Sequence, residues 1–234
     1  MKIAAATVVM ALLAAAAIAS PVRVLVVTGG HTYETSFYTL FEGHPDIEAT
    51  VDPHPMPYRR GDLRPDYDVL VLYDSMQEIS KAERKNLTDF VEGGKGVVVL
   101  HHALVDYSDW RWWREEVVGA RWIKSQAKPL RWKTTWQHDV DIVAYPVKEH
   151  PVVDGVGKFE VNDETYKGMW FSPGITVLMK TDHPTSDGPL VWIGPYSKSR
   201  VVSIELGHGR KAHVHPSFRR LVRNAILWAA GVTK

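Results

Sequence analysis

Short apolar runs that alternate with helical segments constrain the fold of this chain more than any other sequence feature. Three such runs, residues 21–28, 68–73 and 96–100, are rich in valine and leucine, and a shorter strand is predicted at residues 47–51. Strands that are apolar on both faces are typical of parallel sheets covered by helices on both sides. The alternation therefore predicts an α/β fold with a doubly wound, mostly parallel sheet and right-handed crossovers.

Helical segments are predicted between these strands and at the end of the chain. The first spans residues 32–41 and follows the turn Gly29-Gly30. The second begins at a capping box, in which Ser80 accepts from the amide of Glu83 and the Glu83 side chain reaches back, and it ends at Gly93. Further helices are predicted at residues 109–118 and 216–230, the last with apolar residues on one side and arginines on the other.

The second half of the chain is predicted to extend the sheet. Strands are expected at residues 138–144, 175–179, 190–193 and 201–206, and the turn PYSKS joins the last two. The irregular segment 121–136 belongs to a tryptophan-rich stretch over residues 107–136. We interpret this stretch as an insertion that forms a lid over the sheet.

The first 19 residues have the features of a secretory signal peptide. Lys2 precedes a continuous apolar stretch, and Ala17-Ile18-Ala19 has the small-x-small pattern of a signal-peptidase site. The alternative is an N-terminal membrane anchor, although apolar spans shorter than about 18 residues rarely cross a bilayer. We expect residues 1–19 to be removed, leaving one secreted or periplasmic domain, residues 20–234, with no stable membrane span.

The composition excludes several classes of function. The chain has no cysteine, so it has neither disulfides nor a cysteine nucleophile. Without Lys2 it has 27 basic and 27 acidic residues, a balance that does not favour nucleic acid as a partner. A serine hydrolase of this fold class would need a GxSxG motif, which is absent. We expect a small-molecule ligand, and a homo-oligomer is compatible with the sequence.

Histidines follow three of the predicted strands. His31 comes after the first, His101 and His102 come after the strand at residues 96–100, and His208 comes after the last. Ligands of open α/β sheets bind outside the carboxyl ends of the strands, so we expect His31, His101 and His208 to face one crevice. Neighbouring side chains at a strand end point to opposite sides, so His102 is expected to turn toward a packed helix.

The turn Gly29-Gly30-His31 can present backbone amides to a ligand. It has neither the GxGxxG nor the GxxxxGK[ST] spacing, so a nucleotide site is not expected. We assign Gly30 and His31 to binding a sugar hydroxyl or carbonyl oxygen. The alternative is a tight turn whose glycines serve only to expose His31.

A second group of histidines lies in the segment GHGRKAHVHP, residues 207–216. His213 and His215 are two residues apart, which in extended chain turns both side chains to one side. Together with His208 they could hold Zn²⁺ or a similar divalent ion, with a carboxylate as the fourth ligand. The alternative is a polar loop in which His215 caps the last helix.

Two further segments contribute candidate site residues. Glu164, in NDETY, could be a general acid or base or a metal ligand, and the alternative is a solvated surface loop. Trp110 and Trp113 have the character of a sugar-binding rim, although core packing explains these tryptophans as well.

Several motifs occur in a characteristic order over essentially the whole mature chain: VTGGHTYE, GKGVVVLHHAL, EHPVVDGV, NDETY and RVVSIELGHGRKAHVHPSFRRLVRNAILWAAG. Together they resemble the ThuA-like family, which is named for trehalose utilisation. The resemblance implies a flavodoxin-like, class I glutamine-amidotransferase-like fold. It also implies that His101 stands about where amidotransferases keep their nucleophilic cysteine, so glutamine hydrolysis is not expected.

The resemblance further implies a role in bacterial sugar catabolism, commonly beside oxidoreductases that make 3-keto sugars. The family pattern recurs at His31, His101, Glu164, Tyr166 and His208, and less firmly at His150 and His215. We therefore expect an exported sugar or keto-sugar enzyme of isomerase, hydrolase or lyase type, with His101 and Glu164 as acid/base candidates and Tyr166 among the substrate-binding residues. The alternative is a non-catalytic carbohydrate-binding or accessory protein on the same scaffold.

Overall fold

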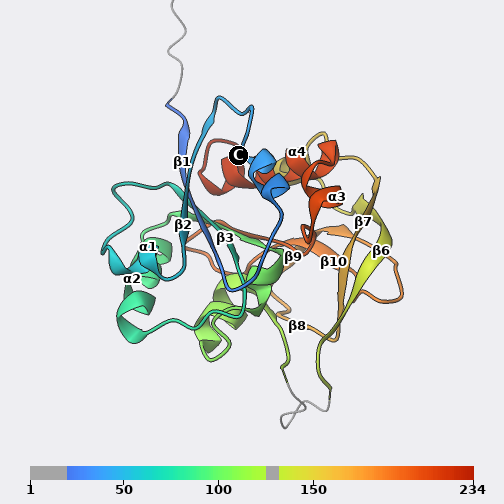
Figure 1. The fold of residues 1–234 in the computed structure, drawn as a ribbon, viewed down its shortest axis with the longest axis horizontal. Coiled ribbons are helices and arrows are strands. Elements are labelled where there is room, and N and C mark those ends of the chain that lie inside the picture. Colours follow the sequence, from blue (N-terminus) through green and yellow to red (C-terminus); the bar gives the residue numbers. More distant parts are fainter. Residues whose placement is uncertain (1–19, 125–131) are drawn as a thin grey trace, which may run out of the picture.

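The computed structural model describes residues 20–124 and 132–234 (Figure 1). The expected signal peptide, residues 1–19, lies outside the described residues, as does the part of the expected lid at residues 125–131. Among the described residues, no helix is long and apolar enough to cross a membrane.

A nine-stranded sheet forms the centre of the molecule, with the strand order β2-β1-β3-β4-β11-β10-β9-β6-β7. Its strands are β1 (Val22–Gly29), β2 (Ile47–Pro53), β3 (Val69–Asp74), β4 (Gly96–Leu100), β6 (Thr135–Pro146), β7 (Phe159–Lys167), β9 (Thr176–Lys180), β10 (Pro189–Ile193) and β11 (Val201–Ile204). A separate antiparallel pair joins β5 (Ala120–Arg121) to β8 (Trp170–Phe171).

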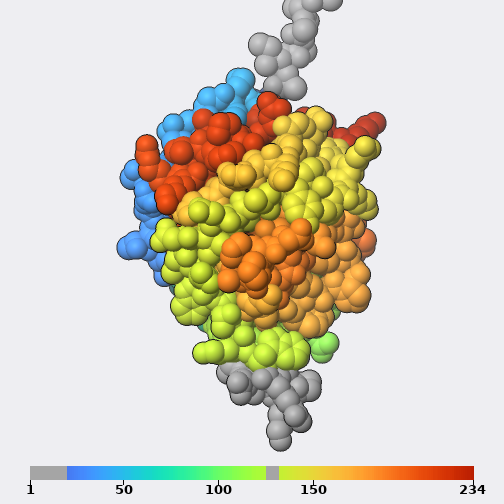
Figure 2. All heavy atoms as spheres, turned by 90° about the vertical axis from the view of Figure 1, so that its right-hand side faces the viewer, coloured from blue at the N-terminus to red at the C-terminus, as the bar shows by residue number. Residues whose placement is uncertain are grey.

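The sheet is mixed, so the expectation of a mostly parallel sheet is wrong. Strands β2, β1, β3, β4 and β11 pair in parallel. Strands β11, β10, β9, β6 and β7 pair antiparallel, and the segments around β6, β7 and β9 appear in yellow-green and orange on the side of the molecule that Figure 2 shows. Short connections such as residues 195–199, between β10 and β11, permit only antiparallel pairing, because a parallel pair needs a crossover of a dozen or more residues.

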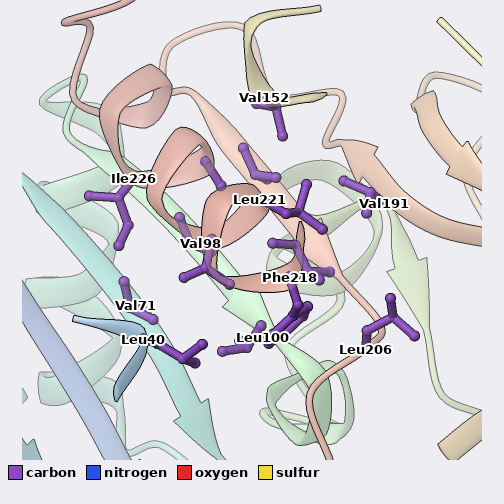
Figure 3. Packing of buried hydrophobic residues seen from close by; sticks show 14 of the residues in the cluster. Leu40, Val71, Val98, Leu100, Val152, Val191, Leu206, Phe218, Leu221 and Ile226 are labelled. Carbon is purple, nitrogen blue, oxygen red and sulfur yellow. The ribbon is translucent and has the colours of Figure 1, made fainter. Parts of the chain in front are cut away.

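Helices cover both faces of the parallel half. The helices are α1 (Met56–Arg59), α2 (Lys81–Glu92), α3 (Arg210–His213) and α4 (Pro216–Ala229). The predicted capping box opens α2: the amide of Glu83 donates to Ser80 Oγ at 3.3 Å and the amide of Ser80 donates to Glu83 Oε2 at 2.8 Å. Phe218 and Leu221 of α4 pack over Val98 and Leu100 of β4 (Figure 3).

Two predicted helices differ from the expectation. The segment predicted as a helix over residues 32–41 is a short 3-10 helix, Thr35–Leu40, whose N-terminal residue Glu34 provides no side-chain cap. The segment predicted at residues 109–118 is a π-helix, Trp112–Val118, which ends at Gly119 with φ +75°. The π-helix buries Trp113 against the α2 side of the sheet.

Candidate functional site

His101 directly follows β4 in a left-handed backbone conformation, with φ +50°. A residue other than glycine rarely adopts such a φ, and residues held there cluster at functional sites. The imidazole is fully buried, and its Nδ1 lies 2.5 Å from the carbonyl oxygen of Glu205. Since a carbonyl can only accept, Nδ1 carries a hydrogen and Nε2 faces the interior of the site.

Glu164 comes from β7, in the antiparallel half, and its carboxylate reaches the end of β4. Oε2 lies 3.0 Å from His101 Nε2 and 3.4 Å from His208 Nδ1, while Oε1 lies 3.2 Å from His138 Nδ1. The Glu164 side chain is only 4% exposed. The structure therefore assembles the two acid/base candidates, His101 and Glu164, in direct contact, and adds His208 to them.

His102 does not turn away from this centre, contrary to the expectation. Its Nε2 lies 3.9 Å from Glu164 Oε2, and its ring centroid lies 4.3 Å from that of His31. The alternation of a strand ends at His101, where the left-handed φ starts a 3-10 turn over His101–Val105. In that turn neighbouring side chains no longer point to opposite sides, and the rings of His101 and His102 lie with centroids 4.1 Å apart.

His138 was not among the sequence candidates. It lies in β6, where the pairing with β7 shifts register between Gln137 and Val140 and Asp139 has φ +54°. Bulges of this kind re-aim a side chain and occur often next to active sites. The acidic and histidine pattern of HDVD offered no signal for the bulge, because a simple alternation fits it equally well.

The charges of the centre are set by its contacts. Burial alone would raise the pKa of Glu164, but its contacts with His101 and His208 hold that pKa well below its ordinary value. The same contact with Glu164 raises the pKa of His208. Burial lowers the pKa of His102 strongly and that of His31 as well. A buried carboxylate thus faces neutral and positively charged imidazoles.

Asp163 fixes the loop that presents His208. One of its carboxylate oxygens accepts from the amide of Gly207 at 2.7 Å, and the other accepts from the amide of His208 at 2.9 Å. His208 and His138 then line an open pocket of about 600 Å³ whose other walls are polar. The pocket meets the centre through these two histidines, both of which contact Glu164, while His101, His102 and Glu164 do not line it.

Tyr166 closes the inner side of the centre. Its hydroxyl lies 3.2 Å from His101 Nε2, and the two rings stack with centroids 5.4 Å apart. The backbone amide of Tyr166 donates to Glu205 Oε1, and burial raises the pKa of Glu205 well above its ordinary value. Tyr166, which is predicted to bind substrate, thus lies in direct contact with His101.

The structure does not bring His213 and His215 to His208 as metal ligands. His213 is buried, with Nδ1 3.0 Å from Ser36 Oγ and Nε2 3.0 Å from the carbonyl oxygen of Gly207. His215 Nδ1 accepts from the amide of Ser217 and caps α4, which was the stated alternative. Among the described residues, the group able to surround an ion is instead His101, His102, Glu164 and His208, whose ligand atoms lie within 4.8 Å of one another.

The tryptophans proposed as a sugar rim pack into the core. Trp113 is 1% exposed, and half-buried Trp110 stacks on it with ring centroids 5.9 Å apart. Core packing, the stated alternative, therefore accounts for both. Gly30 has φ +76°, and a Cβ there would lie 1.9 Å from the carbonyl oxygen of Ser75. The close approach of two loops explains this glycine without a ligand.

A second buried polar cluster lies at the same sheet edge, after β3. Asp74 Oδ2 lies 3.2 Å from His54 Nδ1 and 3.3 Å from the Tyr107 hydroxyl, and the carboxyl of Asp106 lies close enough to feel the charge of Asp74. Burial, followed by the charge of Asp74, raises the pKa of Asp106 well above its ordinary value. We call the group His54, Asp74, Asp106 and Tyr107 the aspartate cluster, and His101, His102, Glu164 and His208 the histidine centre.

Comparisons with known proteins agree with this architecture. The profile of the ThuA family, described as trehalose utilisation, matches residues 23–229. A ThuA-like protein from Parabacteroides merdae has 20% identity and a TM-score of 0.78, over 92% of this chain and 91% of that one. One from Bacteroides uniformis has 18% identity and a TM-score of 0.68, over 92% and 94%. No protein with a curated description matches the chain.

The fold extends beyond that family. A GMP synthase subunit from Thermoplasma acidophilum has 12% identity and a TM-score of 0.58, over 91% of this chain and 96% of that one. At these identities the structural similarities show the fold alone. The fold expected from the sequence motifs, an amidotransferase-like α/β fold, is thereby confirmed, with a mixed sheet.

Proposed function

Because the chain belongs to the ThuA family of trehalose utilisation, we propose that it is an exported enzyme that acts on a sugar or keto-sugar at the histidine centre. The observation that carries the proposal is the set of contacts around Glu164: one buried carboxylate meets the ring nitrogens of His101, His138 and His208 at 3.0–3.4 Å. Burying a charge of this kind is costly, and proteins place such groups chiefly where chemistry requires them.

The arrangement suits a proton transfer beside a sugar carbonyl. A keto-sugar has acidic protons on the carbons next to its carbonyl, and removing one leaves a negative charge on the oxygen. His101 and Glu164 are within the distance at which an acid/base pair can take and return a proton. His208, whose pKa is raised, would supply positive charge to the oxygen, and His31 and Tyr166 would bind neighbouring oxygens.

Isomerisation and elimination begin with such a proton transfer, and hydrolysis needs an acid/base pair of the same kind. Glutamine hydrolysis is excluded, because the position after β4 carries His101 in place of a thiol and the chain contains no cysteine. The reactive groups of this centre are imidazoles and a carboxylate, which suits chemistry on the sugar itself rather than acyl transfer.

The test is incubation of the mature protein with a panel of disaccharides and their 3-keto derivatives, with products identified by mass spectrometry. We expect conversion of at least one keto-sugar by the wild type and its loss in Glu164→Gln. Binding of a panel member without conversion would instead support the carbohydrate-binding or accessory protein. The matched control is Asp106→Asn, which makes the same chemical change in the aspartate cluster.

A further inference from the structure

We propose that the histidine centre is a binding site for a divalent cation of the zinc class. The four residues offer ligand atoms within 4.8 Å of one another, and the contacts with Glu164 Oε2 assign these atoms as His101 Nε2, His102 Nε2 and His208 Nδ1. What the ion would do in a reaction rests on the proposed function: with an ion bound, His101, His208 and Glu164 would act as its ligands instead of as free acid, base and cation, and the ion would supply the positive charge to the sugar oxygen. The binding of the ion itself follows from the geometry of the four side chains.

The spacing of the four atoms fits tetrahedral coordination. Zinc binds imidazole nitrogen and carboxylate oxygen at about 2.0–2.2 Å, which places the ligand atoms of a tetrahedron about 3.3–3.6 Å apart. Around Glu164 Oε2 the observed separations are 3.0 Å to His101, 3.4 Å to His208 and 3.9 Å to His102. His101 Nε2 and His208 Nδ1 are 3.2 Å apart. These four separations lie within a few tenths of an ångström of the tetrahedral range, and all four ligand atoms lie within 4.8 Å of one another.

Lone pairs of nitrogen and oxygen atoms converge at the histidine centre, and a positive charge between them would offset their repulsion. Nδ1 of His101 gives its hydrogen to the carbonyl of Glu205, so in the neutral ring Nε2 carries a lone pair. That lone pair faces a carboxylate oxygen at 3.0 Å and a ring nitrogen of His208 at 3.2 Å. The Tyr166 hydroxyl can donate one hydrogen to it, but Glu164 and His208 still converge on the same point. One cation satisfies all of these atoms together.

His102 provides an independent observation. Its side chain is 18% exposed, and its Nδ1 is buried without a hydrogen-bond partner in the described part of the chain. Its Nε2 lies 3.9 Å from the carboxylate of Glu164, which is too far for a hydrogen bond. An ion between Nε2 and Glu164 would give Nε2 a partner, whereas Nδ1, on the other side of the ring, would stay without one.

The surroundings resemble those of metal ligands in other proteins. Metal-binding histidines usually donate their other ring hydrogen to a carbonyl or carboxylate, which fixes the tautomer and the ring orientation. His101 does so to Glu205, and the loop that presents His208 is held through both oxygens of Asp163. His208 is 39% exposed toward the open pocket, so an ion and then a sugar oxygen, as a fifth ligand, can enter from that side.

The experiment measures Zn²⁺ binding to the purified, metal-stripped mature protein by calorimetry, with thermal unfolding in parallel. We expect one equivalent of Zn²⁺ per chain and a raised Tm. Loss of a residue that only hydrogen-bonds to a metal ligand typically lowers metal affinity by about 10–100-fold. We expect His102→Ala to lower the Zn²⁺ affinity by more than that, because it removes a ligand. His215→Asn is the matched control: it changes a histidine of the sequence-derived set, and asparagine keeps the helix cap, so affinity should stay unchanged.

Co²⁺ absorption provides a readout that does not depend on stability or turnover, since tetrahedral nitrogen and oxygen coordination gives a distinct visible spectrum. Sub-stoichiometric binding, or equal loss in His102→Ala and His215→Asn, would overturn the metal site. Turnover of a sugar by protein that fails to bind Zn²⁺ or Co²⁺ would overturn the metal site and leave the proposed function standing. Stoichiometric binding of the ion without turnover of any sugar would support the metal site and overturn the proposed enzymatic function.

Discussion

The histidine centre and the aspartate cluster lie at the same edge of the sheet, and both bury carboxyl groups, yet their charges differ. In the histidine centre, contacts with His101 and His208 hold the pKa of Glu164 low, so the carboxylate is ionised. In the aspartate cluster, burial and the neighbouring Asp74 raise the pKa of Asp106, so one proton is retained. Partners rather than burial decide which carboxyl carries charge.

The two groups also differ in access. The Asp74 and His54 side chains are 0% and 3% exposed, and Tyr107 is fully buried, so the aspartate cluster is sealed. The histidine centre meets an open pocket through His208 and His138. A sealed group whose polar contacts are internal connects the loops after β2, β3 and β4, whereas an ionised carboxylate next to a pocket can act on a ligand.

The largest expected effect is a loss of activity, and it distinguishes the histidine centre from the aspartate cluster. His101→Asn removes the ring nitrogen that meets Glu164, and asparagine tolerates the left-handed φ of this position. We expect kcat on a keto-sugar to fall by about 100–10,000-fold, which is the usual contribution of a positioned acid or base to the rate. The Tm should stay close to that of the wild type. A Tm loss of many degrees would show that His101 serves the fold instead.

The next effect concerns stability. Asp74→Ala leaves His54, Asp106 and Tyr107 without their shared partner in a sealed site. We expect the free energy of unfolding to fall by about 2–3 kcal/mol, the cost of a buried polar group left unpaired, as measured by urea denaturation. Turnover below the unfolding transition should stay near the wild-type value. A loss of turnover as large as in His101→Asn would remove the distinction between the two groups.

The smallest effect is a pH dependence. Because the folded pKa of Asp106 is raised, its contribution to stability is complete below its ordinary pKa and is lost as pH rises toward the folded pKa. Asp106→Asn cannot ionise, keeps an acceptor for the amide of Gln77 and can donate to Asp74. The Tm of Asp106→Asn relative to the wild type should therefore increase as pH rises above about 4. A constant difference across that range would contradict the shared proton.

Sequence patterns predicted most elements of the parallel half, because apolar runs and the Ser80–Glu83 capping box are local signals. They also predicted that His101 and His208 lie at one edge of the sheet, since the carboxyl ends of parallel strands meet there. The antiparallel half was less accessible to prediction: the pairing direction depends on the short connections, and the position of Glu164 depends on long-range pairing of β7 with β6.

The residues that were misplaced or missed from the sequence lie next to residues with unusual backbone conformations. His102 follows a residue with φ +50°, and His138 precedes one with φ +54° within a register shift. Each exception redirects a side chain in a way that periodicity does not encode. His213, by contrast, was misplaced because an alternating pattern was read where the chain forms α3.

The most direct test of the account compares two isosteric changes, Glu164→Gln and Asp106→Asn, in the same turnover assay on a 3-keto disaccharide. Both variants replace one carboxyl oxygen by an amide nitrogen, and both are expected to fold. The account predicts that Glu164→Gln loses at least about 100-fold in kcat, as for a general acid or base, while Asp106→Asn stays within a few-fold of the wild type. Equal activity of the two variants would contradict the assignment of the chemistry to the histidine centre.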